Sequence, residues 1–524
     1  MRKFFRKLFS PTLIIVLTLV LEVLIIVVGL NVLDYYLDSI SQVWGAFAIL
    51  ALRVALFVAE IIIFFSIIRK SENPEYKIPW ITGMIVFPIS TMLLYLIFAN
   101  HGLRKKDRLI VEPTRKILEE GFKKNEDNIP EIKEEIPPQY LGLFNYLNEA
   151  DKLVASKNNH ITYYKNGEEF FPEFVESLKK AEKFIMMEFF IITEGKWWKQ
   201  IEEVLLEKNK AGVEVMLIYD DMGSFGGLPN NYAIKLRKLG IKCYKFHPFR
   251  PILSGIYNNR DHRKIAVIDH KMAFTGGMNL ADEYANDLLR FGYWKDTMVK
   301  IEGIGIVNLI CTFLQNFDLS QNKISDYKKY VLGEDYPKFE DKGYIHFFGD
   351  GPGGFDGNEP IGEENYVQII NSSTKTLWIS TPYLIPPYQL TEALKRAAKR
   401  GVDVKLFLPG IPDKKAVWWM AIRDFANLSD AGVKIYIYTP GFNHEKQIVA
   451  DDILAFCGTV NFDFRSLTHH FECGATLYDV PCIKEMVEDF KEMENQSELY
   501  VGQYKLSRGK RILVAVMRIV RTLF

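Results

Sequence analysis

The sequence lacks an excess of charge of either sign, since its 524 residues include 65 Lys and Arg and 65 Asp and Glu. Proteins that grip nucleic-acid phosphates without sequence preference usually carry a basic excess, so this balance argues against such a partner. Cysteine is also scarce: there are five, an odd number, and no CxxC pair. This argues against a disulfide framework and a cysteine zinc site, and we expect reduced, mostly buried thiols.

Long apolar runs are present, and they lie near the N-terminus. Residues 11–33, 43–68 and 78–99 each meet the roughly 20 residues that a helix needs to cross a hydrocarbon core. None fits a cleaved signal peptide, whose apolar stretch is shorter. We therefore predict a multi-pass protein of the cell membrane, with a transmembrane region over residues 1–103. Three membrane helices are one interpretation, and two with a re-entrant or interfacial segment are the other. The flanking basic residues leave open which side of the membrane the rest of the chain faces.

A different pattern follows a charged, proline-dotted linker at 104–137. Amphipathic helices alternate with apolar strands, which is typical of βαβ units around a mostly parallel sheet. The pattern occurs twice, because the segment LLEKNKAGVEVMLIYDD is similar to a later segment, LTEALKRAAKRGVDVKLFLPG. We therefore predict an α/β protein with two copies of one α/β/α fold, over 138–330 and 331–503, packed as a pseudo-dimer.

The last segment, 504–524, mixes apolar residues with arginines at helical spacing. Arg511, Arg518 and Arg521 then lie on one side of a helix. The pattern favours a basic amphipathic helix lying on anionic lipid, and a helix docked on the protein's own core is the alternative.

One motif occurs in each copy: a histidine, a lysine two residues later, and an aspartate five residues after the lysine. The motif residues are His262, Lys264 and Asp269 in HRKIAVID, and His444, Lys446 and Asp451 in HEKQIVAD. A small pair and then an asparagine follow each aspartate at the same offsets. These are Gly276-Gly277 with Asn279, and Gly458-Thr459 with Asn461. Repetition at the equivalent place of an internal repeat makes chance occurrence negligible.

The spacing of this motif suits chemistry on a phosphate. Alternate residues of a strand share a face, so each histidine points the same way as its lysine. The glycine leaves room for a phosphate to approach, and a tight turn brings the asparagine back to the same pocket. We expect the lysines and asparagines to bind the phosphoryl oxygens. One histidine attacks phosphorus, and the other protonates the leaving alkoxide.

Acidic residues complete the predicted site. Asp269 and Asp451 are expected to make structural hydrogen bonds within their own halves, with direct chemistry as the alternative. Glu283 and Glu472 follow the motifs, and each is a candidate to orient a histidine ring, with a plain surface or ion-pair role as the alternative. The lysines already supply positive charge and no ligand spacing is present, so we expect neither a metal nor another cofactor.

These motifs resemble those of the phospholipase D superfamily, and the closer resemblance is to the bacterial cardiolipin synthases. It rests on NNRDHRKIAVIDHKMAFTGGMNLADEY and WKDT in the first copy, FNHEKQIVADDILAFCGTVNFDFRS in the second, and NPEYKIPWITGMIVFPISTMLLYLIF in the membrane region. The chain departs from the family at Thr459, where serine is common, and at His470, where asparagine is usual. A further apolar segment precedes the usual pair.

The resemblance implies phosphatidyl transfer between two phosphatidylglycerols, which gives cardiolipin and glycerol through a covalent phosphohistidine. By analogy His262 is the nucleophile. A membrane-bound phospholipase D-type hydrolase or another phosphatidyltransferase is the enzymatic alternative. A catalytically dead membrane scaffold is the third hypothesis, and the presence of both histidines and both lysines argues against it. The expected partners are phospholipid and the membrane, with no nucleic acid, and the oligomeric state stays open.

Overall fold

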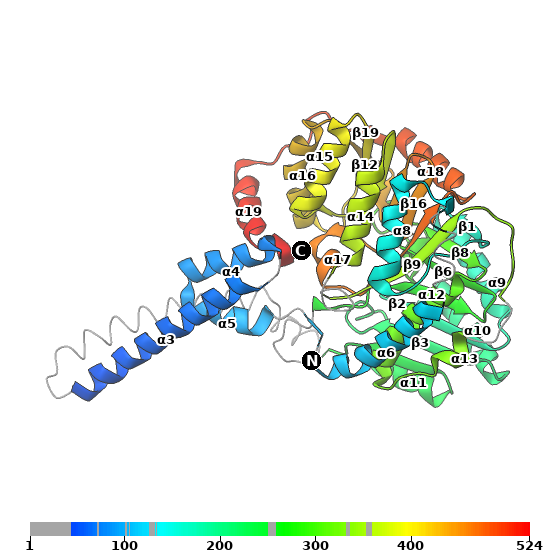
Figure 1. Cartoon of the computed structure of the whole chain (residues 1–524), viewed down its shortest axis with the longest axis horizontal. Coiled ribbons are helices and arrows are strands. Elements are labelled where there is room, and N and C mark those ends of the chain that lie inside the picture. The colour runs from blue at the N-terminus through cyan, green and yellow to red at the C-terminus, as the bar shows by residue number, and fades with distance from the viewer. Residues whose placement is uncertain are drawn as a thin grey trace. The chain divides into compact units, whose positions relative to one another are not determined.

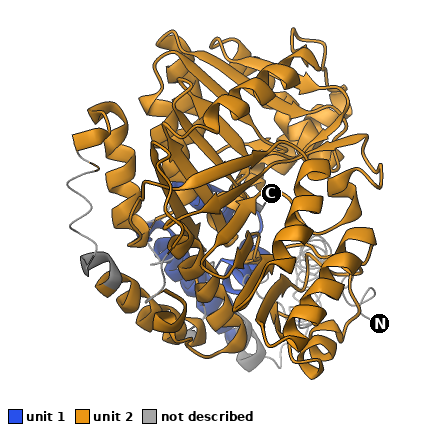
Figure 2. Ribbon diagram, turned by 90° about the vertical axis from the view of Figure 1, so that its right-hand side faces the viewer, with its two compact units in different colours: residues 1–101, 249–257 blue, residues 102–248, 258–524 orange. Residues whose placement is uncertain are grey.

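The computed structural model describes residues 43–70, 73–99, 102–103, 105–124, 132, 134–249, 258–331, 336–352 and 359–523. The chain divides into two compact units, which Figure 2 colours separately. The N-terminal unit comprises residues 1–101 and 249–257, and the α/β unit comprises residues 102–248 and 258–524.

The described part of the N-terminal unit is helical. Its helices are α3 (Val43–Arg69), α4 (Pro74–Val86) and α5 (Pro88–Phe98). Within α3, Leu50–Arg69 is the one stretch among the described residues that is long and apolar enough to cross a membrane. The helix predicted over 43–68 is therefore present, whereas the run 11–33 lies outside the described residues.

The prediction of a single helix over 78–99 is wrong, because the chain breaks at Phe87. This residue has φ −137° and ψ 72°, outside the helical region. Pro88 explains the break, since proline disfavours a helical conformation at the residue before it and donates no backbone hydrogen bond. Neither α4 nor α5 reaches the roughly 20 residues of a membrane span. The alternative of two spans with a re-entrant or interfacial segment stays a prediction.

The first sheet of the α/β unit has seven strands in the order β1-β8-β6-β5-β2-β3-β4. Their bounds are β1 (His160–Tyr164), β2 (Phe184–Phe189), β3 (Glu214–Asp220), β4 (Lys242–Phe246), β5 (Lys264–Ile268), β6 (Met272–Gly276) and β8 (Met298–Glu302). Only β2, β3 and β4 are parallel. The expectation of a mostly parallel sheet fails for the rest, because the motif strand β5 runs against β2 and turns back directly into β6.

The second sheet has eight strands in the order β19-β13-β12-β10-β15-β16-β18-β9. Their bounds are β9 (Tyr344–Asp350), β10 (Thr376–Ser380), β12 (Asp403–Pro409), β13 (Lys434–Tyr438), β15 (Gln447–Ala450), β16 (Leu454–Gly458), β18 (Glu472–Tyr478) and β19 (Ser497–Leu499). Apart from β19, the order repeats that of the first sheet, with β15 and β16 in the places of β5 and β6. The predicted pair of α/β repeats is thus confirmed.

Two short parallel pairs lie outside these sheets: β7 (Tyr293–Lys295) with β14 (Gly441–Asn443), and β11 (Leu384–Ile385) with β17 (Phe462–Asp463). Helices surround the strands (Figure 1). They are α6 (Lys105–Lys124), α8 (Pro138–Asp151), α9 (Gly167–Lys179), α10 (Lys196–Lys210), α11 (Tyr232–Lys238), η3 (Asp282–Ala285), α12 (Ile306–Gln321), α13 (Tyr327–Val331), α14 (Ile361–Ser372), α15 (Tyr388–Lys399), α16 (Lys415–Ser429), α17 (Phe464–Thr468), α18 (Ile483–Asn495), α19 (Arg508–Ile519) and η4 (Arg521–Leu523).

The two repeats share one apolar core. Met186 and Val299 of the first sheet belong to the same buried cluster as Phe347 and Ala475 of the second. α12 contacts strands of both sheets, including β4 and β9. Because apolar surface of both repeats is removed from water in this shared core, each half depends on the other for its burial.

Candidate active site

Each motif histidine lies just before a central strand, where the two halves pair through their backbones. Asp261 bridges to Phe471, and the N–H of His262 donates to the carbonyl of Phe471 at 2.8 Å. In the other half, β14 pairs with β7, and the N–H of His444 donates to the carbonyl of Lys295 at 2.7 Å. Both histidines are therefore fixed at the seam between the halves.

Carboxylates hold both rings, and each carboxylate comes from the opposite half. Nδ1 of His262 lies 3.0 and 2.9 Å from the two oxygens of Glu472, the first residue of β18. Nδ1 of His444 lies 2.6 Å from Oδ2 of Asp296, just before β8. A neutral imidazole that donates from Nδ1 keeps its lone pair on Nε2, which is then the atom available to attack or to take up a proton.

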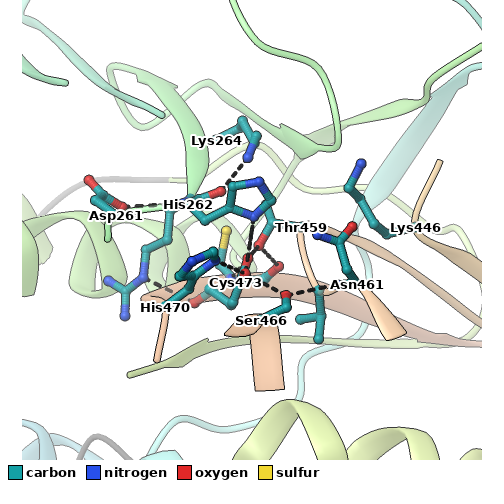
Figure 3. Close-up of polar contacts among 12 residues, drawn as sticks. Asp261, His262, Lys264, Lys446, Thr459, Asn461, Ser466, His470 and Cys473 are labelled. Atoms are coloured by element: carbon teal, nitrogen blue, oxygen red, sulfur yellow. Dashed lines mark hydrogen bonds and ion pairs between the residues drawn. The ribbon is translucent and has the colours of Figure 1, made fainter. Parts of the chain in front are cut away.

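The small pair after each motif makes room for, or binds, these carboxylates. A Cβ on Gly277 would lie 2.0 Å from Oδ1 of Asp296, so the space that we expected a phosphate to use is filled by this carboxylate. At the equivalent position, Thr459 donates its hydroxyl hydrogen bond to Glu472. Ser466 of α17 donates a second one to the same carboxylate, and Figure 3 shows Thr459 and Ser466 near His262.

Two lysines are buried beside the rings. Each ammonium group donates to the carbonyl of its own motif histidine, and Nζ of Lys446 also lies 2.9 Å from Nδ1 of His444. Burial lowers the pKa of Lys264 to about 7 and that of Lys446 to about 8, although Glu472 and Asp296 act in the opposite direction. A phosphodiester anion in this site would favour the charged lysines again, so the pair is suited to bind one.

Burial also lowers the pKa of both histidines well below the ordinary value. For His262, the charges of Lys264, Lys446 and His444 act in the same direction, so charged groups of both halves influence one ring. Both rings are therefore neutral near pH 7 before substrate binds, which an attacking histidine requires. The negative charge of a bound phosphodiester opposes this effect and favours the protonated ring that an acid requires.

The two asparagines differ in how strongly the protein holds them. Oδ1 of Asn279 accepts from the N–H of Ile191 at 2.9 Å, and its Nδ2 donates to the hydroxyl of Tyr284 at 2.7 Å. The Tyr284 ring centroid lies 5.6 Å from that of His444, so Asn279 positions a ring beside the second histidine. Oδ1 of Asn461, by contrast, is buried and has no hydrogen-bond partner within the part of the chain that the structure describes.

Asp269 and Asp451 lie at the far ends of the motif strands, away from the histidines that precede these strands. Both have φ of 53°, in the turn to the next strand. Asp269 accepts hydrogen bonds of 2.8 to 2.9 Å from the backbone N–H groups of residues 182–184. Asp451 accepts bonds of 2.7 to 3.1 Å from those of residues 374–376. These are structural hydrogen bonds within each half, as we expected.

We predict that Asp451→Asn reduces the free energy of unfolding by about 1–3 kcal/mol at neutral pH, because an amide replaces a charged acceptor. Burial raises the pKa of Asp451, but its backbone hydrogen bonds outweigh burial and leave this pKa below the ordinary 3.8. The stabilisation is therefore present above the unfolded-state pKa and is lost as the pH falls through the lowered folded-state pKa. Unfolding measured in detergent from about pH 7 down to about pH 3 should show the difference shrinking.

The exposed neighbour Asp452 provides the control for this measurement. Asp452→Asn should unfold like the wild type throughout. A deficit of Asp451→Asn that stays constant with pH would contradict the charged hydrogen-bonding role.

Glu283 does not fill the place beside His444 that the sequence suggested. It lies in η3, 3.9 Å from Arg290. Asp296, the aspartate of the WKDT stretch, takes that place. The repeat contained the signal: Asp296 comes two residues before Met298, which pairs with Gly276, and Glu472 comes two residues before Gly474, which pairs with Gly458.

His470 forms a cluster that sequence reasoning did not foresee. One potential ligand atom of each of His262, His470 and Glu472 lies within 4.8 Å of the others. We assign no cation to this cluster, because Glu472 is already bonded to Nδ1 of His262 and to the hydroxyls of Thr459 and Ser466. The arrangement instead suits a buried acid that is fully occupied in orienting its histidine.

Comparison with known proteins agrees with this arrangement. A family model described as "Cardiolipin synthase, PLD-like domain" matches residues 174–289 and 366–494, one stretch in each half. A second, described as "Phospholipase_D-nuclease N-terminal", matches residues 59–100. The crystal structure of phosphatidylserine synthase from Haemophilus influenzae is 13% identical, covers 70% of this chain and 95% of its own, and superposes with a TM-score of 0.55. At that identity the likeness shows a shared fold alone.

Sequence relatives extend over most of the chain. An uncharacterized protein of Streptococcus mutans is 43% identical over 421 residues, which are 80% of this chain and 90% of that protein. Cardiolipin synthase 2 of Bacillus anthracis is 33% identical over 464 residues, 87% of this chain and 88% of that protein. Together with the duplicated motif and its seam between two halves, these matches show that the chain belongs to the cardiolipin synthase family of the phospholipase D superfamily.

Proposed function

We propose that this protein transfers a phosphatidyl group from one phosphatidylglycerol to another, giving cardiolipin and glycerol. The observation that carries the proposal is the crossed pairing at the seam, in which each motif histidine is held through Nδ1 by a carboxylate of the opposite half. This pairing leaves two Nε2 atoms and two buried lysines for one phosphodiester. The cardiolipin synthases among the relatives support the choice of lipid substrate.

In the first step, Nε2 of one histidine attacks phosphorus and forms a P–N bond. The bond from phosphorus to the glycerol headgroup oxygen breaks, and that oxygen takes the proton from Nε2 of the other, protonated histidine. Glycerol leaves, and the phosphatidyl group stays on the first histidine. We assign the attack to His262 and the proton transfer to His444, by analogy with the family.

In the second step the acid acts as a base. Neutral His444 accepts the proton of the terminal hydroxyl on the second phosphatidylglycerol, and that oxygen attacks phosphorus. The P–N bond breaks, cardiolipin forms, and both histidines return to their starting states. The lysine pair stabilises the charge that develops on the phosphoryl oxygens in both steps.

The remaining polar residues assist this chemistry from fixed positions. Both side-chain amide atoms of Asn279 are hydrogen-bonded, and Asn279 positions Tyr284. Among the residues that the structure describes, the amide of Asn461 has an unbonded oxygen, so Asn461 is the better candidate to turn its NH₂ group toward a phosphoryl oxygen. Glu472 and Asp296 fix the tautomers and stabilise the charged rings. Asp269 and Asp451 act through the fold, since their oxygens bind backbone N–H groups.

The proposal also places the enzyme at the cell membrane, where its lipid substrate lies. Leu50–Arg69 of α3, which is long and apolar enough to cross a membrane, supports this location. The multi-pass part of the proposal rests on the sequence of the run 11–33.

A product analysis tests the proposed function. The purified full chain, in nanodiscs of phosphatidylglycerol labelled in both glycerol and acyl groups, should release glycerol and accumulate an equal amount of cardiolipin. Nanodiscs of phosphatidylcholine alone should give neither product. Phosphatidic acid as the sole lipid product would show a hydrolase, and labelled glycerol release with a different lipid product would show another phosphatidyltransferase.

A further inference from the structure

The C-terminal helix α19 is docked on the α/β unit by one of its faces. Val514 is 1% exposed, and the guanidinium group of Arg518 lies 2.7 Å from the carboxylate of Asp424 in α16. The ammonium group of Lys510 lies 4.7 Å from the ring centroid of Trp419, also in α16. The predicted alternative of a helix docked on the protein is therefore confirmed for this face.

The opposite face of α19 is apolar and exposed. At 100° per residue, positions 512, 516 and 519 fall on the side of the helix opposite to 514 and 518. The exposed fractions are 69% for Ile512, 47% for Leu513, 58% for Val516 and 49% for Ile519. Isolated exposed apolar residues need no explanation, but a contiguous stripe indicates a surface that binds a partner.

The charge around this stripe identifies the kind of partner. The segment 505–521 contains six basic residues and no acidic residue, although charge balances over the whole chain. Arg508 and Arg511 are both exposed; at 100° per residue Arg508 lies beside the stripe, and Arg511 lies at the edge of the docked face, next to Arg518. An occupant must therefore be both apolar and anionic, and the surface of a membrane that contains anionic phospholipid has both properties.

We propose that α19 lies along the surface of an anionic membrane, with its stripe among the acyl chains near the headgroups and its arginines on the lipid phosphates. The segment that follows connects this surface to the active site. Arg521 of η4 lies 5.3 Å from the ring centroid of Phe464 in α17, and Ser466 of α17 donates to Glu472. The C-terminal segment, bound to the membrane through α19, thus supports α17, the helix whose Ser466 binds the carboxylate of Glu472 beside His262.

Site-specific fluorescence in the full chain tests this proposal without reference to catalysis. The five native cysteines are buried, so a cysteine-reactive fluorophore can be placed through Val516→Cys. In nanodiscs that contain brominated phosphatidylglycerol, this label should be quenched at least about twofold. Adding Arg508→Glu and Arg511→Glu, or raising the salt concentration, should reduce the quenching.

Ile304→Cys provides the matched control, because Ile304 is 44% exposed and follows the end of β8 that lies away from Asp296. Its label should show little quenching. Equal quenching at the two positions would overturn the proposal. Quenching at position 516 that is as strong in brominated phosphatidylcholine, and unchanged by the arginine substitutions, would overturn the selectivity for anionic lipid.

Discussion

His262→Ala should lower the rate of cardiolipin formation by about 10⁴-fold or more, and His444→Ala should do the same. Each change removes a group that the two-step mechanism cannot replace: one supplies the nucleophile, and the other moves the proton. Both rings are buried at the seam, and each is held through Nδ1 by a carboxylate. Initial rates in phosphatidylglycerol nanodiscs provide the measurement.

His160→Ala is the control for these substitutions, because Nδ1 of His160 also lies 2.7 Å from a carboxylate oxygen, that of Asp341, but His160 begins β1, an edge strand of the first sheet. This variant should turn over at the wild-type rate. A near-normal rate for either motif variant would remove the two-histidine mechanism.

The two motif histidines should respond differently to the leaving group. A phosphatidyl ester of nitrophenol leaves without needing a proton, so it should restore the first step in His444→Ala and leave His262→Ala inactive. The reverse pattern would exchange their roles and keep the rest of the mechanism.

Asp296→Asn should reduce kcat/KM by about 10²–10⁴-fold, although it preserves the size and shape of the side chain. Oδ2 of Asp296 lies 2.6 Å from Nδ1 of His444, and an amide there can present its NH₂ group to the ring and favour the wrong tautomer. The amide also lacks the charge that stabilises the imidazolium. Burial raises the pKa of Asp296 to about 6, while the lysines oppose this shift and favour the ionised form that the role requires.

Glu283→Gln is the matched control for Asp296→Asn, because it makes the same chemical change in the same half, next to Arg290. We expect its kcat/KM to stay within about twofold of the wild type. Similar losses in the two variants would mean that the contact of Asp296 with His444 has no special role in catalysis. Glu472→Gln should behave like Asp296→Asn, since Glu472 holds the other ring.

Much of this site follows from sequence because the repeat carries the chemistry twice. The motif spacing identifies both histidines and both lysines, and the equivalent offsets identify Asn279 and Asn461. The expected shared strand face is wrong, because β5 begins at Lys264 and β15 begins at Gln447, so both histidines precede their strands. The crossed pairing does not follow in this way, because His444 and Asp296 are 148 residues apart along the chain. Strand periodicity shows which side of a sheet a residue faces, but not which residue of the other half faces it.

The break at Phe87 and the two faces of α19 show the same limit. Pro88 was visible in the sequence, yet the apolar length of 78–99 favoured a single span, and only the backbone conformation shows that the helix stops. For α19, helical spacing predicted an amphipathic helix. It could not show that one face is already bound to α16, because that contact depends on residues far away in the chain, such as Asp424.

A crystal structure of the protein with orthovanadate, which mimics the five-coordinate phosphorus of phosphoryl transfer, tests the central claim most directly. The account predicts a single vanadium atom bonded to Nε2 of one motif histidine, with Nε2 of the other at hydrogen-bond distance from an apical oxygen and both lysines on the remaining oxygens. Vanadate bound to one half alone, with the second imidazole out of reach, would contradict it.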